Sequence, residues 1–248
     1  MGKPIRIFRH AELEGPGYLL EVMGRHGIPC EVVAIDHSEP VPADVDGASG
    51  LVFLGGPVDV HDHAPWIGRQ VALVRQAVGR GVPVLGHGFG AELITRALGG
   101  MVVRSRYRRV GWFPVRCMDN TPSRQWLHGL AQTFDLFHCQ DHAFSLPPGA
   151  TPILNSQWCL IEGYVMGGVL ALQGHLEVTE AMLHKWVSAN AGPWSRLQGS
   201  APPDNLTLNW DAVVQGREAI TDRLADKVDA LHRVADAVYG HWLSHLPR

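Results

Sequence analysis

The chain has 248 residues, a net charge of −3 and 46% hydrophobic residues. This length suits one large α/β domain or two small ones, with enough apolar side chains for a core. No long Lys/Arg run is present, and the densest basic stretch, 104–109, is better explained by an exposed strand face than by a site for nucleic acid or an anionic membrane.

The first half of the chain alternates short apolar runs with helical patterns. Strands are predicted at 4–8, 31–35, 51–54 and 82–85, and helices at 17–26, from Pro65 to just before Gly81, and at 89–98. Strands that alternate with helices of this length are typical of βαβ units. They predict an α/β fold with a central, mostly parallel sheet flanked by helices.

The second half changes character. Strands are predicted at 101–115, 133–139, 151–160 and 163–173, and they either extend the same sheet or form a small antiparallel flap. After a connecting loop at 191–209, apolar residues three or four apart from Ile220 to Trp242 predict a helix with one buried face. We expect a single domain over 1–248, in which about 205–248 is a helical extension packed on the rest.

Neither the N-terminus nor the cysteines indicate export. Residues 1–8 are too short and too charged for a signal peptide, and no apolar run approaches the roughly 18 residues of a membrane-spanning helix. The four cysteines show no CxxC pair and no zinc spacing, which is typical of reduced thiols in the cytoplasm. We therefore expect a soluble, cytoplasmic protein that binds neither nucleic acid nor membranes.

The segment from 82 to 98 combines a strand, a tight glycine turn and a helix. Its centre is Gly86-His87-Gly88-Phe89-Gly90. Such a turn holds its central residue in a strained conformation at the helix N-terminus, where the helix dipole would stabilise a thiolate. Glycines flank the centre because a Cβ there would clash with the neighbouring strand and helix.

Three blocks, in order along the chain, resemble class I glutamine amidotransferases. Gly55-Gly56-Pro57 is similar to the family's loop that supplies an oxyanion-hole amide, and the turn at 86–90 to its nucleophile motif Gly-x-Cys-x-Gly. Gln173-Gly174-His175-Leu176-Glu177 is similar to the block that carries the catalytic histidine and its carboxylate. The resemblance covers about residues 3–190, looks like a stand-alone bacterial branch and implies a flavodoxin-like amidotransferase fold.

The family's chemistry gives each block a role. A thiolate attacks the side-chain amide of glutamine, forms a thioester and releases ammonia. The resemblance implies that His175 carries protons, that Glu177 holds its tautomer, and that amides near Gly55, Gly56 and Phe89 bind the oxyanion. It implies no cofactor. Because this chain shows no acceptor domain, a synthase or other acceptor partner would be a separate protein.

This sequence departs from the family pattern at several positions. Gly88 occupies the nucleophile position, so no thiolate can form there. Glu92 replaces a glutamine that helps hold substrate and places a negative charge beside a glutamine carboxylate. Gly174 stands where phenylalanine is usual, and 139–142 replaces a Trp-His-Gly-Asp type segment. Together these departures favour natural loss of glutaminase activity over an engineered substitution at position 88. They favour a ligand-binding or regulatory role that involves a glutamine-like small molecule.

Two alternatives keep an active site. Cys139 is a candidate for a relocated nucleophile, although a buried apolar thiol explains it more simply. A zinc site could use histidines in the expected active-site loops, but no pair has the i, i+4 spacing of helical ligands, so we expect no metal. The histidines in question, with one carboxylate, are His61, Asp62, His63, His87, His138, His142 and His175.

Overall fold

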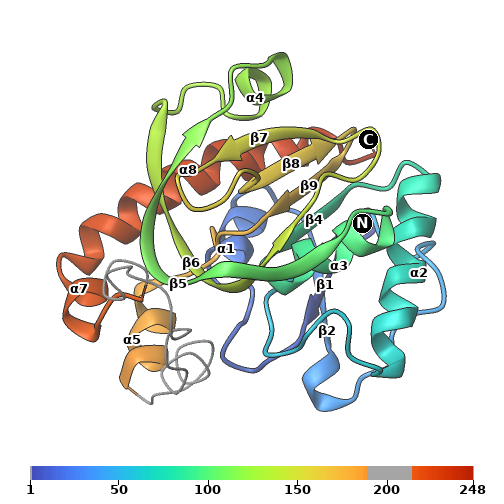
Figure 1. Ribbon diagram of the computed structural model, residues 1–248. Helices are drawn as coiled ribbons and strands as arrows, with labels where there is room; N and C mark the ends of the chain where they lie inside the picture. Colours follow the sequence, from blue (N-terminus) through green and yellow to red (C-terminus); the bar gives the residue numbers. More distant parts are fainter. Residues whose placement is uncertain (1, 189–213, 248) are drawn as a thin grey trace.

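The computed structural model describes residues 2–188 and 214–247, and Figure 1 shows one sheet with helices on both faces. The strands are β1 (Ile5–Arg9), β2 (Cys30–Ala34), β3 (Gly50–Phe53), β4 (Val84–His87), β5 (Val102–Cys117), β6 (Thr133–Phe144), β7 (Thr151–Asn155), β8 (Gly163–Met166) and β9 (Val169–Leu172). The helices are α1 (Tyr18–Arg25), α2 (Pro65–Gly79), α3 (Phe89–Ala97), α4 (Thr121–Trp126), α5 (Glu180–Ser188), α7 (Arg217–Thr221) and α8 (Leu224–Leu243), with a short 3₁₀ turn at Ile35–His37.

The described strands form a nine-stranded sheet in the order β2-β1-β3-β4-β9-β8-β7-β5-β6. Along this order, neighbouring strands pair in parallel from β2 through β1, β3 and β4 to β9. From β9 through β8, β7 and β5 to β6 they pair antiparallel. The predicted α/β class is confirmed. The strands of the second half extend the same sheet, which makes it mixed.

Three strand predictions in the second half are wrong in their limits. The run at 163–173 is a hairpin of two strands, because Gly167 turns the chain with a φ of 57°. The run at 151–160 leaves the sheet at Asn155. The run predicted at 133–139 continues to Phe144, because β6 pairs with the long β5. The predicted loop at 191–209 lies outside the described residues.

The two faces of the sheet have separate apolar cores. Side chains of α1, α5 and α8 pack with one face, and those of α2 and α3 with the other. The predicted C-terminal helix is confirmed, since α8 buries one face along its length, including Val228, Leu231, Val238 and Trp242. None of the described helices is long and apolar enough to cross a membrane.

Candidate functional site

The glycine turn at 86–90 connects β4 to α3. Gly88 has a φ of 53° and a ψ of −119°, a conformation that residues with side chains rarely adopt. A Cβ at Gly86 would lie 2.5 Å from Ile94 Cδ1, and one at Gly90 would lie 2.0 Å from the Phe53 carbonyl oxygen. The flanking glycines therefore let α3 pack directly against β4 and β3, as the sequence predicted.

His175 and Glu177 meet at this turn. Glu177 Oε1 accepts a hydrogen bond from His175 Nδ1 at 2.7 Å, and both side chains are almost wholly buried. The other imidazole nitrogen, Nε2, lies 2.9 Å from the point that a Cβ on Gly88 would occupy. A histidine with this tautomer and direction is arranged as a general base for a group at position 88.

The ionisation of Glu177 follows from its neighbours. Burial by itself would raise the pKa of this carboxyl, but the facing imidazoles of His87 and His175 and the hydrogen bond from His175 lower it to about 2. Glu177 Oε2 lies 3.7 Å from His87 Nδ1 and has no hydrogen-bond partner among the described residues. The carboxylate is therefore held ionised between two histidines at neutral pH.

The loop after β3 also lies close to the Gly88 position. The point that a Cβ on Gly88 would occupy lies 3.8 Å from the Gly55 Cα, and a Cβ on Gly55 would lie 2.9 Å from His175 Cε1. A Cβ on Gly55 would also lie 2.5 Å from Glu14 Oε2. A Cβ on Gly56 would lie 2.6 Å from His10 Cβ. Side chains thus approach both glycines closely, and a larger residue at either position would have to displace them.

Glu14 and His10 were not among the predicted site residues. Both are buried, in the loop that follows β1. His10 packs between Trp66 and Phe89, with ring centroids 5.4 and 4.8 Å away, and burial lowers its pKa. Their position after a parallel strand was the available signal, because ligand sites in open α/β sheets gather at the carboxyl ends of the strands.

Glu92 lies one helical turn after Gly88 and is buried. Burial raises the pKa of its carboxyl, and His142 Nδ1 lies 3.5 Å from its Oε1. Asp59 Oδ2 lies 3.4 Å from the other nitrogen of His142, and Asp141 lies beside it at 3.3 Å. The hydrogen bond to Glu92 and the nearby carboxylates raise the pKa of His142 to about 9. A protonated His142 therefore joins α3, β6 and the loop after β3 at neutral pH.

A buried ion pair supports the segment 173–177, which carries His175. Arg109 donates two hydrogen bonds to Glu162, at 2.6 and 2.8 Å, and His138 lies 3.2 Å from the same carboxylate. Arg109 was expected on an exposed strand face, and that prediction is wrong because its side chain is 1% exposed. The Glu162 carbonyl oxygen accepts a hydrogen bond from the Gln173 amide, so this network fixes the start of the segment 173–177.

The same segment explains Gly174. A Cβ on Gly174 would lie 2.8 Å from Leu136 Cδ1 and 3.4 Å from His138 Nε2. The His175 amide also donates to the Phe137 carbonyl at 2.8 Å. β6 therefore approaches so closely that no larger residue fits at 174 without a shift of Leu136.

The residues of the two alternative hypotheses are dispersed. Within residues 2–188 and 214–247, no three His, Cys, Asp or Glu side chains gather as a metal site. His61 contacts the Val102 carbonyl at 3.0 Å, whereas His63 is exposed. Cys139 is partly buried and packs against the apolar cluster on the face that carries α8.

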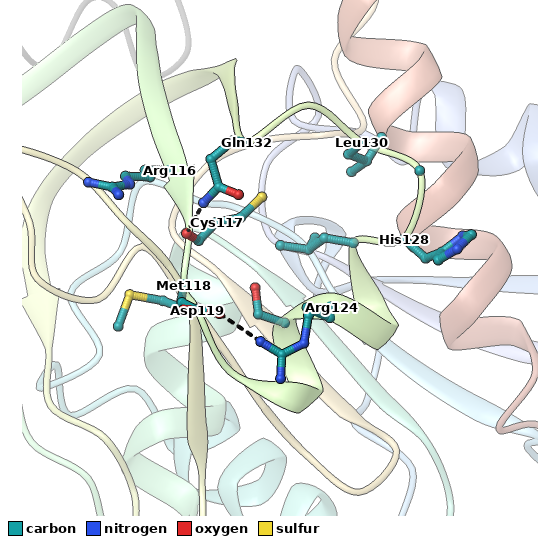
Figure 2. Close-up of a pocket in the computed structure, with 11 residues that line it drawn as sticks. Arg116, Cys117, Met118, Asp119, Arg124, His128, Leu130 and Gln132 are labelled. Carbon is teal, nitrogen blue, oxygen red and sulfur yellow. Dashed lines mark hydrogen bonds and ion pairs between the residues drawn. The ribbon is translucent and has the colours of Figure 1, made fainter.

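A separate open pocket of about 590 Å³ lies between the end of β5, α4 and the loop before β6. It shares no residue with the His175–Glu177 pair. Figure 2 shows Arg116 and His128 at opposite ends of it, while Arg124 is paired with Asp119 at 2.6 Å. Because its charged groups do not converge, this pocket is a poor candidate for the site.

The comparisons with known proteins agree with this geometry. Residues 18–188 match the model of glutamine amidotransferase class-I. The chain belongs to the class I glutamine amidotransferase family. Its fold is similar to a crystal structure of a glutamine amidotransferase from Methylobacillus flagellatus, with 34% identity, a TM-score of 0.90 and coverage of 99% of this chain and 96% of that one.

The matches to curated relatives in this family cover only part of each chain. Gamma-glutamyl peptidase 3 of Arabidopsis thaliana is 28% identical over 159 residues, which cover 62% of this chain and 64% of the peptidase. The glutamine-hydrolysing GMP synthase of Alkalilimnicola ehrlichii is 32% identical over 166 residues, which cover 62% of this chain and 30% of the synthase. The match thus spans under two thirds of the peptidase and less than a third of the synthase.

Proposed function

We propose that this chain is a glutamine amidotransferase-like protein without glutaminase activity, which binds a small glutamine-like ligand. The observation that carries the proposal is the approach of His175 Nε2 to 2.9 Å from the Cβ position of Gly88. A base is aimed at the site of a nucleophile, and the residue there has no side chain. Without a covalent nucleophile, only binding and electrostatic stabilisation remain.

The ligand-binding part of the proposal rests on the site around Gly88. The Gly55 Cα lies 3.8 Å from the Cβ position of Gly88, Gly56 follows it in the loop after β3, and Phe89 and Glu92 lie in the first turn of α3. Main-chain amides at a helix N-terminus and in a glycine loop are suited to hold a carbonyl oxygen or a small anion. A carboxamide that enters this space would meet those groups and His175 without being attacked.

Calorimetric titration of the purified protein with L-glutamine tests binding directly. We expect saturable binding near one ligand per chain, weakened by His175→Phe, which keeps a ring but removes both nitrogens. His128→Ala is a matched control, because His128 lines the separate pocket. An absence of binding by glutamine and by other small carboxamides would remove the ligand-binding part of the proposal.

A separate acceptor is part of the same proposal. The family relatives include GMP synthases in which the matching region is about 30% of the chain. By that likeness, we propose that a synthase or other acceptor acts with this chain as its partner, and that the protein acts in the cytoplasm. Co-purification of the untagged chain with a synthase would support the first part.

Cys139 remains the alternative nucleophile, for an active hydrolase. The backbone of Phe137 bridges to His175, and Cys139 follows two residues later, on the same side of β6 as Phe137. Its packing against an apolar cluster favours the simpler explanation of a core thiol. Cys139→Ser separates the two, because a core thiol tolerates serine without any change in chemistry.

A further inference from the structure

The C-terminal helix reaches the site through a chain of buried hydrogen bonds. The Tyr239 hydroxyl on α8 lies 2.9 Å from His87 Nε2, and His87 Nδ1 lies 3.1 Å from the Gly174 carbonyl oxygen. Both side chains are 0% exposed. His87 precedes the vacant position, and Gly174 precedes His175, so this chain joins both halves of the site to α8.

The donors and acceptors in this chain can be assigned. A carbonyl oxygen only accepts, so His87 Nδ1 carries the proton that Gly174 receives. Burial lowers the pKa of His87, which keeps the imidazole neutral and leaves Nε2 as an acceptor. Burial raises the pKa of Tyr239 well above its ordinary value, so the phenol keeps its proton and donates it to Nε2.

The assigned tautomer acts on Glu177. His87 Nδ1 lies 3.7 Å from Glu177 Oε2, the carboxylate oxygen that is not bonded to His175 Nδ1. The two imidazole rings are 6.5 Å apart and inclined by 25°. If His87 took the other tautomer, a lone pair would face both the Gly174 carbonyl and the carboxylate, which is electrostatically unfavourable.

α8 also holds the far end of the same segment. His232 Nε2 lies 3.0 Å from the Val178 carbonyl oxygen, and its ring stacks on Tyr18 at 3.5 Å. The Tyr18 amide in turn donates to the Glu177 carbonyl at 2.9 Å. Residues 174–178 are therefore tied to α8 at both ends, although α8 lies outside the region that matches the family model.

We propose that Tyr239 is a positioning residue of the site: it fixes the tautomer of His87, and His87 thereby orients Gly174 and Glu177 around His175. The C-terminal helix thus completes the site as well as packing on the sheet. This inference rests on the proposed assignment of His175 and Glu177 as the surviving pair. It does not depend on which ligand binds.

The first test measures the unmodified protein and uses two variants only to assign its signals. Long-range proton–nitrogen correlation spectra of the ¹⁵N-histidine-labelled full chain report which ring nitrogen of each histidine carries a proton, and His87→Gln and His175→Gln assign the signals. We expect His87 in the Nδ1–H form and His175 with its Nδ1 protonated. An Nε2–H form of His87 in the unmodified protein would overturn the proposal.

The second test removes one oxygen atom. In Tyr239→Phe, we expect more than about a tenth of His87 to leave the Nδ1–H form, because Nε2 loses its donor. The pKa of His175 should rise by about half a unit, because the less restrained Glu177 then attracts the imidazole proton more strongly. Unchanged tautomers and an unchanged His175 titration would show that Tyr239 only packs.

Tyr164→Phe is the matched control. Tyr164 is also 0% exposed, and its hydroxyl bonds to Thr95 Oγ1 at 3.0 Å, in the core on the opposite face of the sheet. We expect it to leave the spectra of His87 and His175 unchanged. These readouts are independent of glutaminase assays, so a failure of the proposed function and a failure of this inference are told apart.

Discussion

The turn at 86–90 and the segment at 173–177 contribute the two halves of one site, and they differ in what they retain. The segment has its histidine, its carboxylate, the 2.7 Å hydrogen bond between them, and main-chain hydrogen bonds to Phe137 and Glu162. The turn has its strained backbone and its close contacts, but Gly88 contributes no side chain. The geometry of the turn therefore does not depend on a nucleophile.

This difference has a physical reason. The conformation at Gly88 is set by Gly86 and Gly90, which let α3 approach within van der Waals contact of β3 and β4. A glycine at the centre relaxes the strain that another residue would bear there, by about 1–3 kcal/mol. A glycine at position 88 thus favours the fold, while it supplies no side chain that could act as a nucleophile.

Restoring a thiol at the turn should produce the largest effect. We expect Gly88→Cys to release ammonia from glutamine at least about a hundredfold faster than Gly88→Ala, because both bear the same backbone strain and only one has a nucleophile. His175 must move by a few tenths of an ångström to admit the new Cβ. Equal rates in the two variants would show that position 88 is not the nucleophile site.

Removing the carboxylate from the other half should change stability with pH. The pKa of Glu177 is lowered from 4.5 to about 2 in the folded protein, so its ionised form stabilises the fold above pH 4.5. That contribution is lost as the pH falls from about 4.5 to about 2. We expect Glu177→Gln to be less stable by roughly 3 kcal/mol at pH 7, with the gap closing below pH 4.5.

Urea denaturation at pH 7, 5, 4 and 3 measures this difference. Glu12→Gln is the control, since Glu12 lies in the loop after β1 and is exposed. Its stability should follow that of the unmodified protein at every pH. A constant gap between Glu177→Gln and the unmodified protein from pH 7 to pH 3 would contradict the assigned ionisation.

The packing of the histidine segment on β6 can be tested at Gly174. Gly174→Ala should destabilise the fold by about 1–3 kcal/mol, because the new Cβ would lie 2.8 Å from Leu136. Gly68→Ala is the matched control on α2, where nothing lies within 4 Å, and it should stabilise the protein by up to about 1 kcal/mol. Thermal unfolding of both variants decides whether β6 is as close as described.

The smallest expected effect concerns Glu92. In a Gly88→Cys background, Glu92→Gln should lower the KM for glutamine about tenfold, because it removes a negative charge beside the expected position of the substrate carboxylate. The pKa of His142 should fall from about 9, since its main hydrogen-bonding partner is no longer charged. A raised KM would show that Glu92 favours the ligand.

The sequence predicted the α/β class, the order of elements in the first half and the turn around Gly88, because glycine spacing and apolar periodicity determine these locally. It also paired His175 with Glu177, which share one face of an extended segment. Their placement as the working residues of this site stays a proposal.

Long-range contacts could not be predicted. Arg109 follows the pattern of an exposed strand, yet it is buried because Glu162, 53 residues later, neutralises it. Tyr239 was not singled out in the sequence, because its contact with His87 spans 152 residues. Neither local propensity nor spacing contains information about such pairs.

Ammonia release from glutamine by the unmodified protein, measured beside Cys139→Ser, is the most direct test of the central claim. We expect no release above the rate in buffer from either protein, because Gly88 supplies no nucleophile to the base at His175. Release at a rate typical of an amidotransferase would contradict the account. If Cys139→Ser then abolished it, the nucleophile would be the thiol on β6.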